Sequence, residues 1–455
     1  MARSTRPDDG PATRSRGPSM ILLLALVAAC QRDPIDARPA PPRTTADPTP
    51  SVDAAPPEST PTRPKATVRY ADELAAVDER IKAHRARADA TTGWPVLASL
   101  ADDYLERARL TGDYDDYAAA EAALKEAFGR AVDGGGPLFT RAQLHFTLHR
   151  LAEASADLER LSKKVVIDDR ERANLDGLRA DIAFQRGDMP AALAGYEAAL
   201  AAKRSSTALA RMALYRWKLG DHEGADALYA EAYDAYDGDA RQPAAWYKLV
   251  RGLLDLDRGR DREALAHYRE AEAELAGYWL VEEHIAEILN RLGERDASIA
   301  LYESLVERTH NPEFMDALAD ILREQGETAR AEALVRDSRA AYERLLAQFP
   351  EAAAGHAIGH YLDRGDQPKR ALELAIANHE TRPNPDAKVL LARAHLAAGD
   401  PAAAEAVIRE ALRGPWDFAD LHAVAAEVFA ARGLADEAAA EKAKARAIDP
   451  SSVDE

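Results

Sequence analysis

Cysteine is nearly absent from this 455-residue chain, which contains one, and aromatic residues make up only 6% of it. A single thiol can form neither an intramolecular disulfide nor a thiolate metal cluster. The uncharged run at residues 17–31 is shorter than the ~20 residues that a membrane-spanning helix needs. The formal net charge of −19 disfavours a nucleic-acid partner, because phosphate backbones repel an acidic surface.

The one cysteine, Cys30, directly follows this apolar run. Four arginines precede the run and small residues end it, which is the basic, apolar, then small order of a secretory signal. The residues Val27, Ala28, Ala29 and Cys30 resemble the lipobox of bacterial lipoproteins. The resemblance implies that the Cys30 thiol receives a diacylglycerol and becomes the first residue after cleavage. The alternative is ordinary signal cleavage beside a chance cysteine.

The residue after this cysteine is glutamine rather than aspartate. In lipoproteins of two-membrane bacteria, aspartate at this position tends to hold the protein at the inner membrane. The resemblance therefore implies an outer-membrane anchor, with the protein facing the periplasm or the cell surface. Two or three acyl chains would make this anchor durable, because each buried methylene contributes about 0.8 kcal/mol.

Composition divides the rest of the chain into three further parts. Residues 30–66 are rich in Pro, Thr and Ala and almost empty of large apolar side chains, so they predict a disordered tether. Residues 67–92 predict one N-terminal helix, and residues 93–455 are rich in Ala, Leu and Glu, which favour helix. With residues 1–29 as the signal peptide, this gives the expected domain organisation.

A repeat of about 34 residues runs through the last part. Each unit reads as a helix, a short turn with glycine, and a second alanine-rich helix. The expected turn glycines are Gly112, Gly187, Gly220, Gly259, Gly293, Gly326, Gly365, Gly399 and Gly433. The unit between the first two lacks its glycine, and its turn is expected near His149 and Arg150.

Small residues recur where the two helices of each unit must approach closely. Seven residues before the turn glycine stand Ala180, Ala213, Gly252, Ala286, Ala319, Ala392 and Ala426, and five after it stand Ala192, Ala225, Ala264, Ser298, Ala331, Ala404 and Ala438. Tyrosines follow at nine, as Tyr196, Tyr229, Tyr268 and Tyr302. This pattern resembles the tetratricopeptide repeat family. The resemblance implies an all-α, right-handed superhelical solenoid of about ten helical hairpins.

Three departures from the family pattern mark places where the local geometry is expected to differ. Ile358 and Leu105 replace the small residue in the units of Gly365 and Gly112. The segment RDSRAAYERLLAQFP predicts an elongated second helix that ends before Pro350.

Motifs for catalysis are missing from the sequence. It contains no GxxxxGK[ST] phosphate loop, no HExxH zinc helix and no GxSxG elbow, so we predict no enzyme activity and no cofactor. Two histidine pairs have helical i, i+4 spacing, His145 with His149 and His356 with His360. Such a pair can place two imidazoles on one helix face as metal ligands, but neither has an evident third ligand. His356 and His360 are kept as weak metal candidates.

The family's concave face supplies the predicted partner-binding residues. Its positions are occupied here by Trp217, Lys218, Trp246, Leu249, Glu287, Asn290, Arg291, Arg323, Asp386 and Arg393. Aromatic anchors and arginines carry much of the energy of protein interfaces. The opposing interpretation places Trp217 and Trp246 in the core between repeats. The lysine clamp with which some family members hold a C-terminal carboxylate is missing, since Gly177, Ala210, Leu249 and Glu283 stand at its lysine positions.

These observations favour a non-catalytic, lipid-anchored scaffold of the bacterial cell envelope that binds a protein or peptide partner through the concave face. Two alternatives stay open. One is a metal-dependent accessory or envelope enzyme that uses the histidine pairs, and the other is a factor for assembly or export of surface polymers.

Overall fold

The computed structural model describes residues 68–89, 91–132, 135–163 and 169–453. The expected signal peptide at 1–29, the lipidation site Cys30 with its motif, and the tether at 30–66 lie outside the described residues. No helix in the described part is both long and apolar enough to cross a membrane.

The described residues form helices throughout, apart from one pair of two-residue strands. The helices are α2 (Tyr70–Arg87), α3 (Trp94–Thr111), α4 (Tyr114–Arg130), α5 (Leu138–Thr147), α6 (Leu151–Ser162), α7 (Asp169–Gln185), α8 (Met189–Ala202), α9 (Ser206–Lys218), α10 (His222–Asp234), α11 (Arg241–Leu256), α12 (Asp261–Glu274), α13 (Trp279–Arg291), α14 (Arg295–Thr309), α15 (Pro312–Glu324), α16 (Thr328–Gln348), α17 (Pro350–Gly359), the π-helix η1 (His360–Arg364), α18 (Pro368–Thr381), α19 (Pro385–Ala397), α20 (Pro401–Leu412), α21 (Ala419–Ala431) and α22 (Ala435–Ile448).

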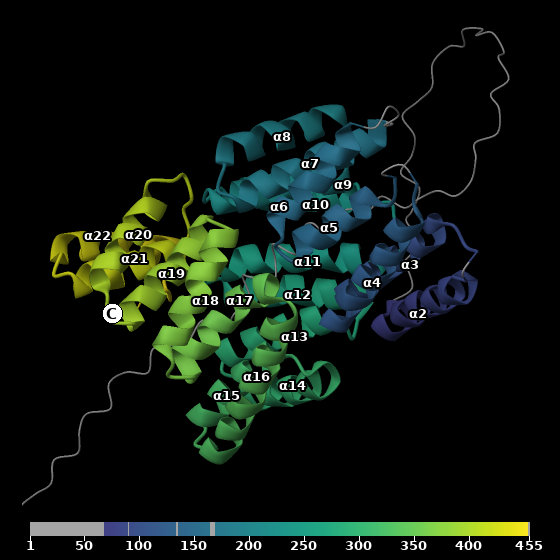
Figure 1. Cartoon of the computed structure of the whole chain (residues 1–455). Coiled ribbons are helices and arrows are strands. Elements are labelled where there is room, and N and C mark those ends of the chain that lie inside the picture. The colour runs from purple at the N-terminus through teal and green to yellow at the C-terminus, as the bar shows by residue number, and fades with distance from the viewer. Residues whose placement is uncertain (1–67, 90, 133–134, 164–168, 454–455) are drawn as a thin grey trace, which may run out of the picture.

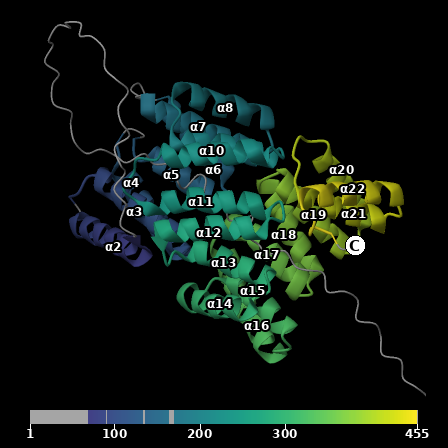
Figure 2. The same cartoon turned by 180° about the vertical axis from the view of Figure 1, so that it is seen from behind.

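From α3 onward the helices pair in sequence order into ten antiparallel hairpins, which we number 1 (α3 and α4) to 10 (α21 and α22). Each hairpin stacks on the next, so the fold is the predicted all-α solenoid of tetratricopeptide-like hairpins (Figure 1). Seen from both sides, α2 to α4 lie at one end and α20 to α22 at the other (Figure 2). Repeats stacked in this way bury their apolar faces mainly against their neighbours.

The turns within the hairpins confirm the repeat register. All the predicted turn glycines except Gly365 have positive φ, between 68° and 86°. In hairpin 2 the residue in this conformation is His149, with φ 59°, which is where the turn without glycine was expected. The second helix of hairpin 7, α16, is the predicted elongated helix, and it ends two residues before Pro350.

Hairpin 8 departs from the regular geometry, as its sequence indicated. Its first helix widens into the π-helix η1, and the left-handed residue of its turn is Asp366 (φ 46°) rather than Gly365. A π-helix accommodates one extra residue per turn, so the turn falls one position later than in the other hairpins. Ile358, at the position that is small elsewhere, is fully buried.

The small residues lie where the two helices of a hairpin meet. Nearly all of them are buried, including Ala180, Ala192, Ala213, Ala225, Ala264, Ala286, Ala319, Ala331, Ala392 and Ala404. Ala438 in the last hairpin is partly exposed. Gly252 has no room for a side chain, because a Cβ atom built on it would lie 2.4 Å from Cε1 of Tyr268 and 3.0 Å from the carbonyl oxygen of Ala264.

We therefore expect Gly252→Ala to destabilise the protein by about 1–3 kcal/mol, although alanine is the better helix former. The added methyl group must push apart α11 and α12, and chemical denaturation measures the cost. The control is Gly129→Ala in α4, where a Cβ meets no atom within 4 Å and where a neutral or slightly stabilising effect is expected. An equal effect of both substitutions would contradict close packing at Gly252.

Contacts between distant hairpins close the solenoid along its axis. The Trp279 indole of hairpin 6 donates to the carbonyl oxygen of Leu110 in hairpin 1 (2.6 Å), and its ring covers Gly112. The Asn384 amide at the start of hairpin 9 donates to Oε1 of Gln185 in hairpin 3 (3.2 Å). Successive turns of the superhelix therefore touch each other, which the repeat pattern alone does not predict.

The N-terminal helix α2 docks on this closed assembly. The strand β1 (Val68–Arg69) just before it pairs in parallel with β2 (Leu275–Ala276), which joins hairpins 5 and 6. The Glu73 carboxylate accepts hydrogen bonds from the first backbone N–H groups of α11, including that of Gln242 (3.3 Å). These groups lack partners inside the helix, so an acidic side chain stabilises them.

Candidate functional site

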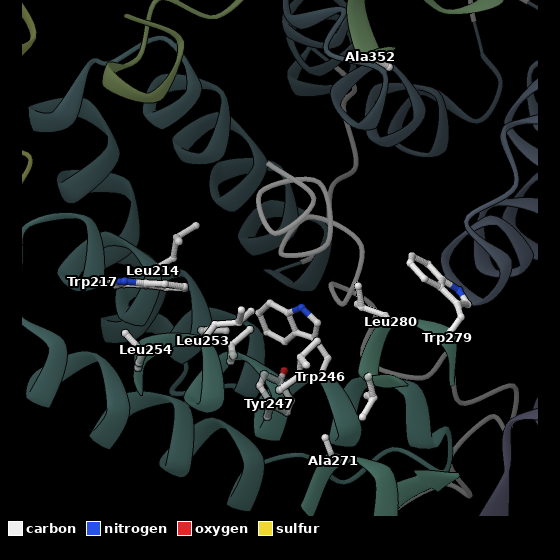
Figure 3. Packing of buried hydrophobic residues seen from close by; sticks show 14 of the residues in the cluster. Leu214, Trp217, Trp246, Tyr247, Leu253, Leu254, Ala271, Trp279, Leu280 and Ala352 are labelled. Atoms are coloured by element: carbon white, nitrogen blue, oxygen red, sulfur yellow. The ribbon is translucent and has the colours of Figure 1, made fainter. Parts of the chain in front are cut away.

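The apolar residues predicted to bind a partner lie in the core instead. Trp217, Trp246 and Leu249 are at most 2% exposed. Figure 3 shows the two indoles among Leu253, Leu254 and Tyr247. The prediction of an apolar, aromatic binding surface is therefore wrong for these three residues. The physical reason is packing between neighbouring repeats, as the opposing interpretation expected: Nε1 of Trp217 donates to Oδ2 of Asp257 in hairpin 5 (3.1 Å), and Trp246 packs against the Tyr229 ring of hairpin 4.

Two other predicted partner-binding residues bind each other. Nζ of Lys218, at the end of α9, lies 3.1 Å from Oδ1 of Asp386 at the start of α19. The Lys218 side chain is almost fully buried, and its Nζ lies 5.3 Å and 5.2 Å from the ring centres of Trp416 and Phe418. This pair joins hairpins 4 and 9, so for these two residues the surface interpretation is corrected by the closure of the superhelix.

The charged candidates of the later hairpins keep part of their surface. Their side chains and those beside them form a set of neighbouring charges, which we call the charged strip: Asp320, Arg323, Asp363, Arg364, Arg393 and Glu427. All keep part of their surface except Arg364, whose side chain is 6% exposed. Arg323 lies 3.0 Å from Asp320, and Arg393 lies 3.1 Å from Asp363. The strip crosses hairpins 7 to 10 on their first helices.

The remaining candidates are Glu287, Asn290 and Arg291, all on α13. Arg291 pairs with Asp261 (2.8 Å) and reaches Oγ of Ser451 near the C-terminal end. Asn290 is partly exposed, and Glu287 belongs to a cluster of acidic and histidine side chains.

This acid–histidine cluster brings three potential metal-ligand side chains close together within the described residues. It consists of Glu283, His284 and Glu287 on α13, whose donor atoms lie within 4.8 Å of one another. Nδ1 of His284 lies 3.1 Å from Oε2 of Glu283 and 3.4 Å from Oε2 of Glu287. The Tyr302 hydroxyl donates to Oε1 of Glu283 (3.4 Å), and the Tyr268 ring stacks on the His284 imidazole.

Burial sets the charge states in this cluster. Desolvation and repulsion from neighbouring carboxylates raise the pKa of Glu283 to about 7. Burial alone would lower the pKa of His284, but attraction to Glu283 and Glu287 outweighs it, and the net pKa is raised. Burial also raises the pKa of the Tyr268 phenol, and the nearby carboxylates of Glu287 and Glu283 raise it further. The cluster therefore favours binding of positive charge, whether a proton or a cation.

The histidines considered as weak metal candidates are engaged by separate carboxylates. Nδ1 of His356 pairs with Oε1 of Glu313, whereas Nδ1 of His360 lies 3.1 Å from Asp316 and 3.0 Å from Oγ of Ser338. Their partners stand one helical turn apart on α15, so each imidazole has its own acid. Among the described residues, the donors that converge are those of the acid–histidine cluster.

The other histidine pair is divided between two neighbourhoods. Nδ1 of His145 lies 3.4 Å from Oδ2 of Asp157. The His149 imidazole meets hairpin 8, with Nδ1 3.2 Å from the Glu351 carbonyl oxygen and Nε2 3.2 Å from Nη1 of Arg382. Nδ1–H therefore donates to the carbonyl group and Nε2 accepts from the guanidinium group. This contact belongs to the axial closure.

The buried pair of His149 and Arg382 predicts acid sensitivity. Burial and then the Arg382 charge hold the pKa of His149 well below its usual value, so the folded protein keeps this imidazole neutral. The unfolded chain takes up a proton below about pH 6.5, and stability falls as the pH drops below that value, by at most about 1.4 kcal/mol per pH unit. Burial also lowers the pKa of Arg382, to about 10.

We expect His149→Asn to flatten the stability profile of the protein between pH 6.5 and 5, because asparagine does not titrate and tolerates the left-handed backbone. Denaturation midpoints at several pH values measure this slope. His310→Asn is the control, since His310 has a similar φ of 51° at an exposed turn. A wild-type profile with no steeper loss than that of His149→Asn would contradict a neutral His149 in the folded state.

The sequence reasoning missed the acid–histidine cluster, although a signal for it was present. Glu283, His284 and Glu287 follow an E-H-x-x-E spacing, which brings the second and third side chains to one helix face. The usual sequence signal for a metal site on a helix is a pair of histidines, and this segment has a single histidine. The contribution of Tyr268 from the preceding hairpin could be recognised only from the packing.

Comparison with known proteins supports the repeat assignment. A tetratricopeptide repeat family model matches residues 139–207 and 356–418. No curated protein sequence matches this chain. Solved structures with a similar arrangement include the human IFIT1 dimer with m7Gppp-AAAA, at 16% identity over 84% of this chain and 95% of that chain, with a TM-score of 0.38.

Two further solved structures are also similar to this chain. A tetratricopeptide repeat protein from Parabacteroides merdae ATCC 43184 is 17% identical over 53% of this chain and 93% of its own, with a TM-score of 0.32. Cut9 in the APC/C hetero-tetramer Cut9-Hcn1 is similar at 14% identity, covering 84% and 92%, also with a TM-score of 0.32. The family model places tetratricopeptide repeats in this chain at residues 139–207 and 356–418.

Proposed function

We propose that this protein is a non-catalytic scaffold of the bacterial cell envelope, held at the outer membrane by acylated Cys30, which binds a protein or peptide partner. Support for the binding role comes from the fold, since tetratricopeptide repeats generally serve as protein-interaction scaffolds. Support for the anchor comes from the sequence before residue 31, which lies outside the described residues.

The single observation that carries the proposed binding site is the exposure of the charged strip. Of the residues predicted to line the concave face, the apolar ones are buried in the core between repeats, whereas Arg323 and Arg393 keep 45% and 36% of their side-chain surface. Alternating guanidinium and carboxylate groups suit a polar partner segment and fix its register. The net charge of −19 on the chain steers a partner segment with net positive charge toward it.

The experiment on the binding site places a photo-crosslinking amino acid at Arg323 or at Arg393 in the full chain in cells. Both positions are expected to capture the same partner. Arg204 is the control, because it pairs with Glu231 on an exposed surface of hairpin 4, away from the strip. Equal capture of the same partner from position 204 would contradict binding at the charged strip.

The anchor is tested separately by labelling cells with a clickable fatty acid. Wild-type protein is expected to carry the label, and Cys30→Ser is expected to lose it together with its membrane association. Persistent labelling of the serine variant would remove the anchor from the proposal without affecting the binding site.

A further inference from the structure

The acid–histidine cluster on α13 carries an inference that does not depend on partner binding. Its three donor atoms come from one helix: Oε2 of Glu283, Nδ1 of His284 and Oε2 of Glu287. We propose that these three side chains form a binding site for one divalent transition-metal ion of the Zn²⁺ class.

Two of the three donor separations are close to those that such an ion requires, and the two carboxylate oxygens lie within 4.8 Å of each other. Nitrogen and oxygen ligands about 2.0–2.2 Å from a tetrahedral Zn²⁺ ion lie roughly 3.3–3.6 Å from one another. Here Nδ1 of His284 lies 3.1 Å and 3.4 Å from the two carboxylate oxygens. A single N–H proton on Nδ1 would have to be shared between both oxygens, and neither distance is as short as a strong charge-assisted hydrogen bond, about 2.7–2.9 Å. An ion between the three atoms would satisfy all of them at once.

A second feature of the site is the hydroxyl group of Tyr268. The Tyr268 ring stacks on the His284 imidazole, with 5.5 Å between ring centres and 25° between ring planes. This residue is fully buried, and its hydroxyl group finds no hydrogen-bond partner among the described residues. An unpartnered buried hydroxyl group is costly. A water molecule or carboxylate oxygen held by the bound ion would give it a partner.

Access and donor chemistry agree with this assignment. The side chains of Glu283 and His284 are 8% and 2% exposed, whereas that of Glu287 is 16% exposed and opens the site on one edge. One imidazole and two carboxylates are a donor set that divalent zinc and its neighbours accept. Three protein ligands leave a fourth position for water.

The test measures Zn²⁺ binding to the purified full chain without an oligohistidine tag, by equilibrium dialysis and elemental analysis. One ion per chain is expected for the wild type, and Glu287→Gln should weaken its affinity at least tenfold while leaving the circular dichroism spectrum unchanged. Tyr268→Phe, which keeps all three ligands, is expected to weaken it less than Glu287→Gln does.

The matched control is Glu441→Gln. His422 also lies between two acids, Glu441 at Nδ1 (2.5 Å) and Asp417 at Nε2 (2.9 Å), but they contact opposite ring nitrogens and cannot share one ion. This substitution is expected to leave Zn²⁺ binding unchanged. Failure of the wild type to bind, or equal affinity in wild type and Glu287→Gln, would overturn the proposal.

A spectroscopic readout covers the case in which Glu287→Gln does not fold. Co²⁺ bound to the wild-type chain in place of Zn²⁺ should give the visible absorption bands of a four-coordinate site with nitrogen and oxygen ligands, and added Zn²⁺ should abolish them. Co²⁺-loaded protein with only the spectrum of the hydrated ion would also overturn the proposal.

Discussion

Replacing Trp246 with alanine is expected to lower the free energy of unfolding by about 3–5 kcal/mol. The indole is fully buried in α11 and packs edge-on against the rings of Tyr229 and Tyr247. Its removal leaves a large cavity between hairpins 4 and 5, which the stacked helices can fill only partly. Urea denaturation followed by circular dichroism measures the loss.

Trp246→Phe serves as the matched control, because it keeps an aromatic ring and deletes less volume. Its expected cost is well below that of alanine. Both variants should capture the same partner when folded, since Trp246 has no surface to offer. An alanine variant of wild-type stability that had lost its partner would restore Trp246 to a binding surface and contradict its burial.

Lys218→Met is expected to destabilise the protein by about 3 kcal/mol, near the lower end of the cost of breaking a buried ion pair. Methionine keeps the apolar stem but leaves Asp386 without its cation, and Oδ2 of this carboxylate already lacks a hydrogen-bond partner. The cost stays near the lower end because the Asp386 side chain is 20% exposed and water still screens its charge.

A double variant separates two contributions to this cost: the lost attraction between Lys218 and Asp386, and the burial of an Asp386 carboxylate that has no cation beside it. Adding Asp386→Asn to Lys218→Met removes the unpaired carboxylate and is expected to recover most of the loss. The surface control is Arg204→Ala, which breaks an exposed pair with Glu231 and should cost less than about 1 kcal/mol. Equal losses in Lys218→Met and Arg204→Ala would mean that the contact between hairpins 4 and 9 adds little to stability.

The local repeat could be read from the sequence because its causes are local. Close helix approach requires a small side chain, and a left-handed turn favours glycine, so Ala264 and Gly293 follow from their own hairpins. The departure at hairpin 8 could be located for the same reason, since Ile358 breaks the pattern at one position. The π-helix that accommodates it could not be predicted, because it depends on how α17 packs.

The candidate site was only partly predictable. The sequence placed Arg323 and Arg393 at groove positions, and the structure leaves both partly exposed. The same repeat positions assigned Trp217 and Trp246 to the groove, but both indoles are buried in the structure. The position of a residue within a repeat predicts which way its side chain points from its own hairpin. It does not predict whether another hairpin covers that side chain.

By itself, the sequence determined the class of the fold, the ten-hairpin register and the mixed, acidic character of the surface, because each depends on residues a few positions apart. Only the tertiary structure decided that successive superhelical turns touch, that Lys218 finds Asp386, and that Tyr268 meets the Glu283, His284 and Glu287 cluster. The physical reason is cumulative. Small rotations between neighbouring hairpins add up over five or six units, and this sum decides which distant side chains meet and which remain open to water.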